Sequence, residues 1–210
     1  DWQAFARFPT WMWRNREFRA FVDWLAAHNR GLHAAQRVRF AGLDLYSLYG
    51  SIASVLQYLD KVDPATAQVA RERYGCLTPW QSDPAAYGRA ALTRAYRTCE
   101  PDVVRVLDHL QHKRLEYARR DGEHVFDAIE NARVAVGAEA YYRAMYYESH
   151  ESWNLRDRHM VGTLERLLQF YGPSSKAVVW AHNSHVGDAS ATDMAARGEL
   201  NIGQLCRRQF

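Results

Sequence analysis

The sequence predicts a helix-rich α/β fold in which a few parallel strands accompany a large helical portion. Apolar residues recur at helical spacing through most of the chain, and two short stretches, 38–45 and 177–181, have the pattern of strands. Helices that lead into all-apolar strands are typical of a parallel sheet covered on both faces. Because two strands do not make a stable sheet, we expect a partial sheet that belongs to a larger α/β domain.

The elements follow in order along the chain. Helical stripes of apolar residues predict helices around residues 18–25, 48–59, 103–120, 125–136 and 160–171. Ser47 is placed to cap the second helix, and Pro64 suits the first turn of another helix. Residues 75–85 are expected to form a loop because of their Gly and Pro content, and "RDGEH" is expected to break the chain's helical middle. We therefore expect residues 1–46 and 150–210 to form an α/β portion with the active-site cleft, and residues 47–149 to form a helical portion.

Composition limits the classes of protein that the chain can represent. Its 210 residues are 48% hydrophobic and 24% charged, enough for an ordinary globular core. A net charge of +3 is too weak to indicate nucleic-acid binding, and no apolar run approaches the about 20 residues of a membrane helix. We expect a small-molecule substrate, no nucleic acid or membrane partner and a cytoplasmic location; the oligomeric state is left open. The chain starts at Asp1 without a methionine, which suggests a processed or excerpted piece.

Three cysteines, Cys76, Cys99 and Cys206, do not make a disulfide framework. Reduced thiols in a cytosolic protein are the simplest interpretation. A bridge between Cys76 and Cys99 is the alternative.

Two histidines follow the second predicted strand in the stretch "KAVVWAHNSHVGDA", residues 176–189. If residues 177–181 form a parallel strand, His182 stands at its carboxyl end, where open α/β sheets bind ligands. His182 and His185 could divide acid and base roles near neutral pH or hold a metal. Asn183 could orient one ring through its second nitrogen. The alternative is a hydrogen-bonded pair of histidines in an ordinary loop.

A second group of polar residues stands in "ESWNLRDRHM", residues 151–160. Asn154 fits a helix N-cap with Asp157 as its capping-box partner, which would make both residues structural. Arg156 would then place a cation in the first turn, against the helix dipole, and such a guanidinium could clamp a carboxylate or stabilise an oxyanion.

Two further residues are candidates for the same site. Asp44 ends the first predicted strand and either lies on the same sheet edge as His182 or is an ordinary turn aspartate. Trp13 either lines a pocket for a bulky ligand or packs in the core, and core packing is the favoured interpretation.

Four long motifs together resemble the erythromycin esterase family, and they run in order through nearly the whole chain. They are "FPTWMWRNREFRAFVDWL", "GLDLYSLYGSIASVLQYLD", "SWNLRDRHM" and "KAVVWAHNSHVGDA…NIGQL". The resemblance implies a parallel α/β sheet with a large helical portion and macrolide-lactone hydrolysis among its activities. It also implies that His182 and His185 lie in the active-site cleft and that the segment holding Asn154, Arg156 and Asp157 borders it.

The sequence also departs from the family pattern. The family has an upstream Gly-Glu-x-x-His motif, whose histidine is the proposed base for activating water, and a further glutamate. This chain starts downstream of both and stops soon after "NIGQLCRRQF". We therefore expect a fragment that is inactive by itself.

The predicted function is ester or lactone hydrolysis, with macrolide inactivation and antibiotic resistance as the expected context. His182, His185 and Arg156 are the predicted catalytic residues. Asn154, Asp157, Asp44, Asn183 and Trp13 are the predicted substrate-binding residues. No cofactor is expected, and a divalent metal at the histidine pair is left open because two ligands are too few without the upstream Glu and His. The alternative function is a non-catalytic or biosynthesis-associated homologue that binds a small molecule.

Overall fold

The computed structural model describes residues 10–146 and 149–210, and this part of the chain consists of helices and loops without a β-strand. The chain divides into two compact units, Asp1–Gly42 and Leu43–Phe210. The predicted grouping of residues 1–46 with 150–210 stays a prediction, because nothing places the first unit relative to the second.

The first unit is built around helix α2, Arg16–Arg30, which follows the short α1, Thr10–Trp13, and precedes a 3₁₀ turn, Ala34–Gln36. Asn15 caps α2, since its side-chain oxygen accepts from the Phe18 amide at 2.8 Å. Phe18 and Leu25, from the predicted stripe, are the buried residues of α2. The chain then folds back on this helix, because the Asn29 side chain bonds both the amide and the carbonyl of Val38, at 2.9 and 2.8 Å.

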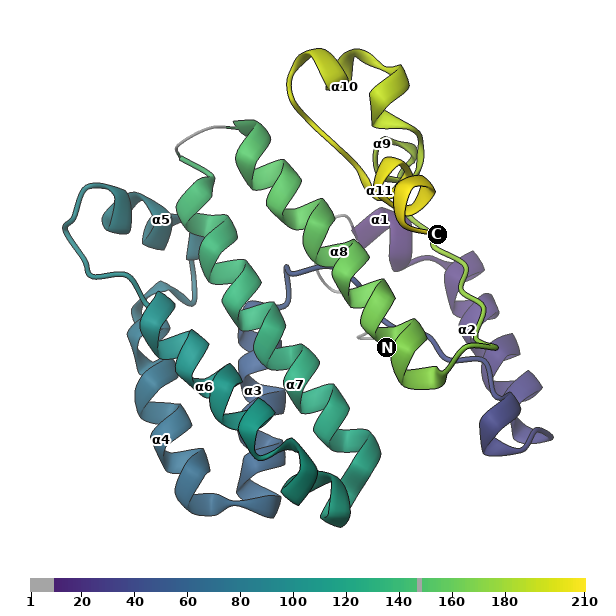
Figure 1. Ribbon diagram of the computed structural model, residues 1–210, viewed down its shortest axis with the longest axis horizontal. Coiled ribbons are helices and arrows are strands. Elements are labelled where there is room, and N and C mark those ends of the chain that lie inside the picture. Colours follow the sequence, from purple (N-terminus) through teal and green to yellow (C-terminus); the bar gives the residue numbers. More distant parts are fainter. Residues whose placement is uncertain (1–9, 147–148) are drawn as a thin grey trace. The chain divides into compact units, whose positions relative to one another are not determined.

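Four helices of the second unit form a bundle in which each packs on two others (Figure 1). They are α3, Leu48–Val62; α4, Pro64–Tyr74; α6, Glu100–His112; and α7, Arg114–Ala144. A 3₁₀ helix, Gly75–Trp80, and α5, Pro84–Leu92, connect α4 to α6. Their apolar stripes meet in one core, of which Val55, Leu59 and Leu110 are fully buried members.

Asp63 is the residue between α3 and α4, and its side chain connects this turn to the start of α7. Its carboxylate accepts from the Thr66 amide at 3.1 Å, as an N-cap of α4, and from Lys113 Nζ at 2.8 Å and the Tyr117 hydroxyl at 2.9 Å. The hydrogen bond from Lys113 holds the pKa of Asp63 well below its ordinary value, against burial that would raise it.

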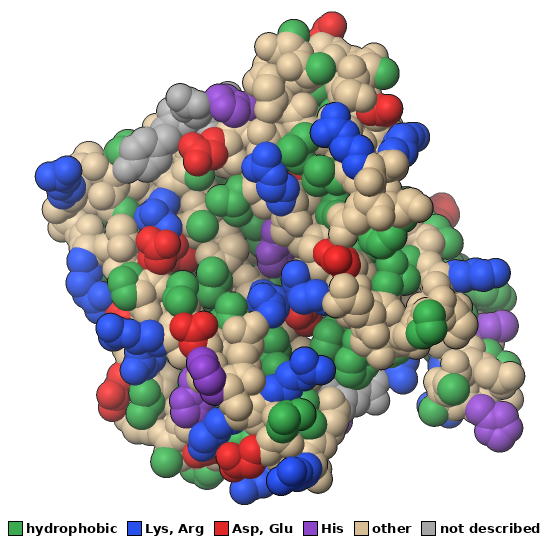
Figure 2. All heavy atoms as spheres, in the orientation of Figure 1, with side chains coloured by type: hydrophobic (Ala, Val, Ile, Leu, Met, Phe, Trp, Pro, Cys, Tyr) green, Lys and Arg blue, Asp and Glu red, His purple; other side chains and the backbone are tan. Residues whose placement is uncertain are grey.

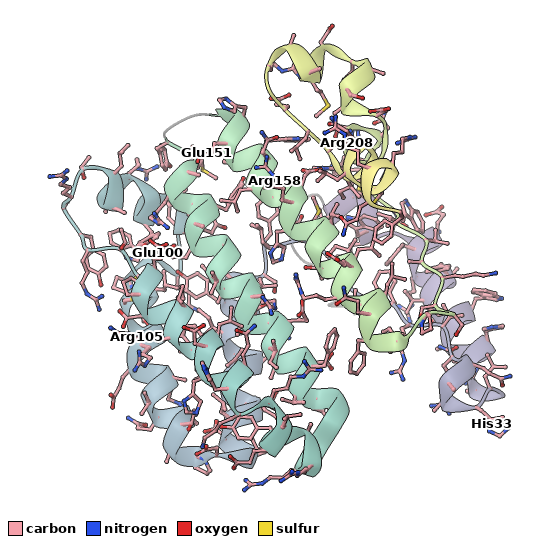
Figure 3. All side chains as sticks on the ribbon, in the orientation of Figure 1. His33, Glu100, Arg105, Glu151, Arg158 and Arg208 are labelled. Atoms are coloured by element: carbon pink, nitrogen blue, oxygen red, sulfur yellow. A yellow bond between two sulfur atoms is a disulfide. The ribbon has the colours of Figure 1, made fainter. Side chains whose placement is uncertain are left out.

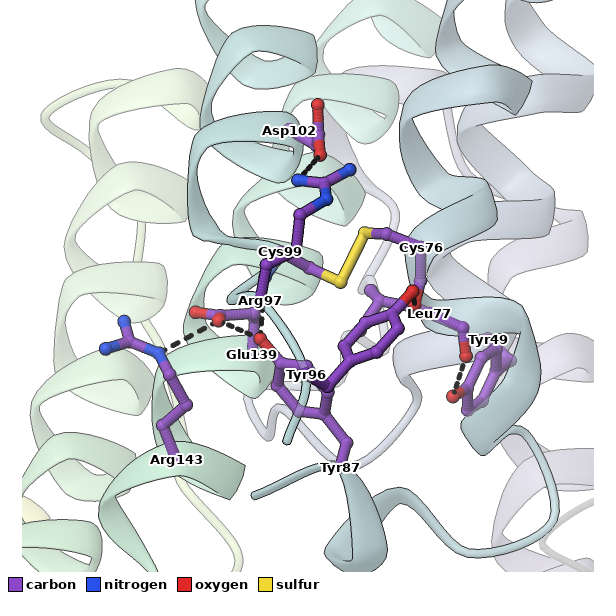
Figure 4. The surroundings of a disulfide bond; sticks show 10 residues. All are labelled: Tyr49, Cys76, Leu77, Tyr87, Tyr96, Arg97, Cys99, Asp102, Glu139 and Arg143. Atoms are coloured by element: carbon purple, nitrogen blue, oxygen red, sulfur yellow. Dashed lines mark hydrogen bonds and ion pairs between the residues drawn. A yellow bond between two sulfur atoms is a disulfide. The ribbon is translucent and has the colours of Figure 1, made fainter. Parts of the chain in front are cut away.

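A disulfide between Cys76 and Cys99 links the 3₁₀ helix to the start of α6 (Figure 4), with the two Cα atoms 5.9 Å apart. The hydroxyl of Tyr87 accepts from the Cys99 amide at 2.8 Å and donates to Glu139, which is 1% exposed. The prediction of reduced thiols is therefore wrong for this pair and holds for Cys206, which is free.

Helix α8, Ser149–Tyr171, packs on α7, and a compact C-terminal assembly packs on α8 (Figure 1). The assembly contains α9, Asn183–Val186; a 3₁₀ turn, Ala189–Ala191; α10, Asp193–Ala196; and α11, Ile202–Gln209. A side chain at Gly203 would collide with the carbonyl oxygens of Val186 and Gly187, so α11 approaches α9 this closely only with glycine there.

The predicted α/β fold with its parallel strands is wrong. Both predicted strands, 38–45 and 177–181, lack a ladder partner in the described chain; Val178 is 97% exposed and Trp180 61%. A helix satisfies its backbone groups internally, whereas a strand needs a neighbour, so strand-like composition alone does not make a sheet.

Helix boundaries also differ from the predicted ones in part. The predicted helix 103–120 is divided at Lys113 between α6 and α7, and the predicted break at "RDGEH" is a kink at Asp121 (φ −161°, ψ 85°) inside α7. Pro64 occupies the first position of α4 as predicted. Ser47 precedes α3 as predicted, yet its side chain makes no capping hydrogen bond.

Candidate functional site

Helix α8 carries polar side chains on two different faces. Successive residues are rotated by about 100° around a helix, so residues three apart share a face while adjacent residues do not. Asn154 and Asp157 therefore face the C-terminal assembly, whereas Arg156 and His159 face elsewhere. Arg158 is exposed (Figure 3), and the structure gives it no ion pair within the described chain.

His185 and Asp157 form the centre of the first face. The imidazole Nδ1 lies 3.0 Å from each carboxylate oxygen of Asp157, and the amide of Ile202 donates to the same carboxylate at 3.0 Å. Asp157 is 0% exposed and His185 8%. Because an ionised carboxylate only accepts hydrogen bonds, Nδ1 carries a proton, and in the neutral form of the ring Nε2 is the nitrogen with a free lone pair.

Trp153 fixes the plane of this imidazole. The two rings stack with centroids 4.6 Å apart and an interplanar angle of 3°. The indole Nε1 in turn donates to the Leu200 carbonyl at 2.7 Å. The side-chain hydrogen bonds of His185 within the described chain all use Nδ1, so an oriented imidazole keeps Nε2 for a ligand.

Asn154 holds the loop that leads into α11. Its side chain donates to the Gly198 carbonyl at 2.8 Å and accepts from the Leu200 amide at 2.8 Å. The predicted N-cap and capping box at Asn154 and Asp157 are wrong, because α8 begins at Ser149 and both residues lie further into the helix.

Asn201 is a member of this site that sequence reasoning missed. It is 1% exposed, caps α11 by accepting from the Gln204 amide at 2.9 Å, and donates to the Ser184 carbonyl at 2.9 Å. The signal in the sequence was an Asn directly before an apolar helical stretch, with Gln three residues later, the pattern of a capping box.

His182 and Asn183 lie apart from the buried dyad. Both are exposed, and His182 is the N-cap of α9, its Nδ1 accepting from the Ser184 amide at 3.2 Å. His182 therefore does not end a strand, and the two histidines of the motif stand in different surroundings.

The second face of α8 carries Arg156, which pairs with Asp44 from the loop before α3. The guanidinium Nε and Nη2 donate to the two oxygens of Asp44 at 2.9 and 2.6 Å, and the group lies 4.3 Å from the ring centroid of Tyr46. The Tyr46 hydroxyl is 3.0 Å from that of Tyr141. Burial opposes the charge of Arg156, but its hydrogen bonds to Asp44 and the attraction of that carboxylate outweigh burial and raise its pKa.

The carboxylate that Arg156 binds is Asp44 of the same chain, and the predicted role of Arg156 in catalysis stays a prediction. The argument from the helix dipole is wrong. Arg156 stands beyond the first turn of α8, so it does not oppose the positive end of the helix dipole.

His159 was also missed by sequence reasoning, although it follows Arg156 by three residues on the same helix face. Its Nε2 is buried and has no partner among the described residues. Burial, reinforced by the nearby charge of Arg166, lowers the pKa of His159 to about 4, so the ring is neutral at physiological pH. On α7, Gly137 faces this ring.

Trp13 belongs to the first unit, where its ring packs edge-on against Phe18 at 5.1 Å. Its predicted role in substrate binding stays a prediction. Within the described chain, no group of three or more His, Cys, Asp or Glu side chains could hold a metal ion, so His182 and His185 gain no third protein ligand here.

The family model described as erythromycin esterase matches residues 1–210. A solved structure titled a succinoglycan biosynthesis protein is similar with a TM-score of 0.74 and 19% sequence identity, over 94% of this chain. The match covers 46% of that other chain, so the present chain spans less than half of its length. At this identity the likeness concerns the fold.

Proposed function

The chain belongs to the erythromycin esterase family, and from that premise we propose that it forms part of a hydrolase acting on an ester or lactone. Macrolide inactivation, and with it antibiotic resistance, is the proposed context. The observation that carries the proposal is the buried carboxylate–imidazole pair of Asp157 and His185, which leaves Nε2 as a base.

The proposed chemistry is attack of water on the substrate carbonyl. As the water oxygen bonds to the carbonyl carbon, its proton passes to His185 Nε2; when the C–O bond to the leaving alcohol breaks, the imidazolium returns that proton to the alcohol oxygen. Asp157 keeps the ring in the required tautomer and stabilises the imidazolium. The resemblance implies a further, upstream histidine that helps to activate the water, and His185 is proposed to work beside it.

Arg156 is proposed to stabilise the developing oxyanion. Its Nε and Nη2 are engaged by Asp44, which fixes the plane of the guanidinium. The hydrogen bonds of Arg156 within the described chain use Nε and Nη2, so Nη1 is the nitrogen proposed to donate to a substrate oxygen. The exposed His182 is proposed to bind the substrate or polarise its carbonyl from the surface of α9.

The test is hydrolysis of a panel of macrolides and simple aryl esters by the full-length protein that contains this chain. We expect His185→Ala to lower kcat/KM by roughly 100-fold or more, as loss of acid–base catalysis predicts. His182→Ala tests the proposed contact of that exposed histidine with the substrate. The matched control is His33→Ala, because His33 is an exposed histidine of the first unit that makes no capping hydrogen bond. Equal rates for His185→Ala and the parent protein would contradict the proposal, and the isolated chain is expected to be inactive.

A non-catalytic homologue that binds a small molecule is the second candidate. The observation that favours it is the fold likeness to a protein whose title names succinoglycan biosynthesis rather than hydrolysis. The two functions separate in one experiment: a ligand that raises the melting temperature of the full-length protein but is recovered uncleaved supports binding alone.

The cytoplasm is the proposed location. No helix among the described residues is long and apolar enough to cross a membrane. The Cys76–Cys99 disulfide provides the test, because such bonds are rare in cytosolic proteins. Thiols are alkylated in intact cells, and the protein is analysed by mass spectrometry. Alkylation of both cysteines agrees with the cytoplasm, whereas an intact disulfide contradicts it.

A further inference from the structure

A pocket of about 320 Å³ lies between α4 and α6, in the four-helix bundle. The site around His185 is built from α8, α9 and α11, whereas the residues of this pocket lie on α4 and α6. The two sites therefore share no residue. Its apolar lining comes from Ala65, Val69, Ala70 and Val106, and its polar lining comes from Thr66, Arg73, Arg105 and His109. The polar side chains include two guanidinium groups and no carboxylate.

The two arginines of this pocket have no anionic partner among the described residues. Arg105 is exposed on α6 (Figure 3), and no carboxylate of the described chain pairs with it. Arg73, on α4, is partly buried, and its Nη1 is completely buried without a hydrogen-bond acceptor. A buried, unsatisfied donor on a charged group is costly, so an acceptor from outside the chain would relieve it.

Hydrogen bonds orient the polar wall of the pocket. Thr66 Oγ1 donates to Asp63 at 2.9 Å and lies 3.1 Å from His109 Nε2. Because the hydroxyl proton is used on Asp63, His109 Nε2 is the donor to Thr66. The same Asp63 carboxylate already binds Lys113 and Tyr117, so it does not neutralise the pocket.

Positive charge prevails around His109. Burial, together with the charges of Lys113, Arg73 and His112, lowers the pKa of His109, whereas Asp63 acts in the opposite direction. The surface over α6 carries basic side chains and histidines interspersed with acidic ones (Figure 2). The excess of positive charge is therefore local to the pocket, whose lining holds two guanidinium groups and no carboxylate.

We propose that the pocket between α4 and α6 binds the phosphate group of a phosphorylated small molecule, with Arg73 and Arg105 as its ligands. Arginine forks match the tetrahedral oxygens of phosphate through paired hydrogen bonds. The apolar wall of Val69, Ala70 and Val106 accommodates the organic part of a phosphate monoester, which inorganic phosphate lacks.

Isothermal titration of the full-length protein with phenyl phosphate, inorganic phosphate and phenol, at constant ionic strength, tests the proposal. Phenyl phosphate should bind most tightly and phenol least. Arg105→Gln should weaken phenyl phosphate binding by at least roughly tenfold, as loss of a charge-assisted hydrogen bond predicts. The matched control is Arg119→Gln, which removes the same charge. Arg119 is an exposed arginine of α7 without an ion pair among the described residues.

NMR of the unmodified protein gives a second readout that requires no variant to fold. Addition of phenyl phosphate should shift the amide and side-chain signals of Thr66, Val69, Val106 and His109. Equal weakening by Arg105→Gln and Arg119→Gln, or shifts spread over the whole surface, would overturn the proposal as general charge attraction. Binding to phosphatidic acid vesicles that phenyl phosphate does not compete away would assign the pocket to a lipid headgroup and likewise overturn it.

Discussion

Replacement of Asp157 by Asn isolates the role of the buried carboxylate. Asn has nearly the same shape, so its side-chain oxygen can still accept from the Ile202 amide, as the carboxylate does at 3.0 Å. Its amide nitrogen then faces His185 Nδ1 as a donor. Two donors cannot share a hydrogen bond, and the new amide nitrogen takes the place of an oxygen that lies 3.0 Å from Nδ1. This contact favours the tautomer that carries the proton on Nε2 and leaves Nδ1 as the acceptor.

The expected magnitudes differ for stability and for activity. Asp157 is 0% exposed, and two hydrogen bonds to a charged group become bonds to a neutral amide, at a cost of about 1–3 kcal/mol in the free energy of unfolding. Activity should fall more, because Nε2 no longer accepts a proton. The corresponding change in a Ser-His-Asp triad lowers kcat by about 10⁴-fold, so we expect a loss of roughly 10²–10⁴-fold here.

Long-range ¹⁵N–¹H NMR of the His185 side chain measures the tautomer directly, without the need for a substrate. The parent protein should show the proton on Nδ1 and Asp157→Asn should show it on Nε2. Urea unfolding and hydrolysis by the full-length protein give the two magnitudes, and Asp188→Asn is the control, since Asp188 is a nearby carboxylate that caps a turn without touching His185. An unchanged tautomer in Asp157→Asn would refute the reasoning.

Three further outcomes concern the bundle and the C-terminal assembly. Cys76→Ala with Cys99→Ala, whose disulfide spans 23 residues, should lower the free energy of unfolding by about 3 kcal/mol, and an unchanged urea midpoint would count against this. The hydrogen bond from Lys113 lowers the pKa of Asp63 below its ordinary 3.8. The ionised Asp63 carboxylate therefore stabilises the fold fully above pH 3.8, and this stabilisation is lost as the pH falls below that value. Asp63→Asn should show less acid destabilisation than the parent protein in urea titrations from about pH 5 to pH 2. Gly203→Ala should loosen α11 from α9, seen as faster amide exchange there while the bundle amides stay protected.

Helical periodicity predicted most of the described helices, because burial of an apolar stripe is a local property of the sequence. Leu48, Val55 and Leu59 were expected on one face of a helix, and all are buried in the bundle core. The strands were not predictable in the same way. Val178 and Trp180 have strand-like composition, yet a strand depends on backbone groups supplied by a neighbour, and none is present among the described residues.

The sequence predicted several residues of the candidate site but not which of them contact one another. The sequence singled out Asp157 and His185 for separate reasons, but their contact joins residues 28 positions apart and follows from how the C-terminal assembly packs on α8. The same holds for Arg156 and Asp44, 112 positions apart. His159 went unnoticed because a buried histidine without a partner has no signature in sequence spacing.

The sequence by itself determined the helical stripes, the early position of Pro64 and the family to which the chain belongs, since these depend on neighbouring residues or on the order of motifs. The tertiary structure alone decided which polar side chains meet. It buried His185 against Asp157 and Trp153, left His182 at the surface, and joined Cys76 to Cys99. The physical reason is that hydrogen-bond partners and burial across a helix interface are set by packing between distant segments, which local spacing does not encode.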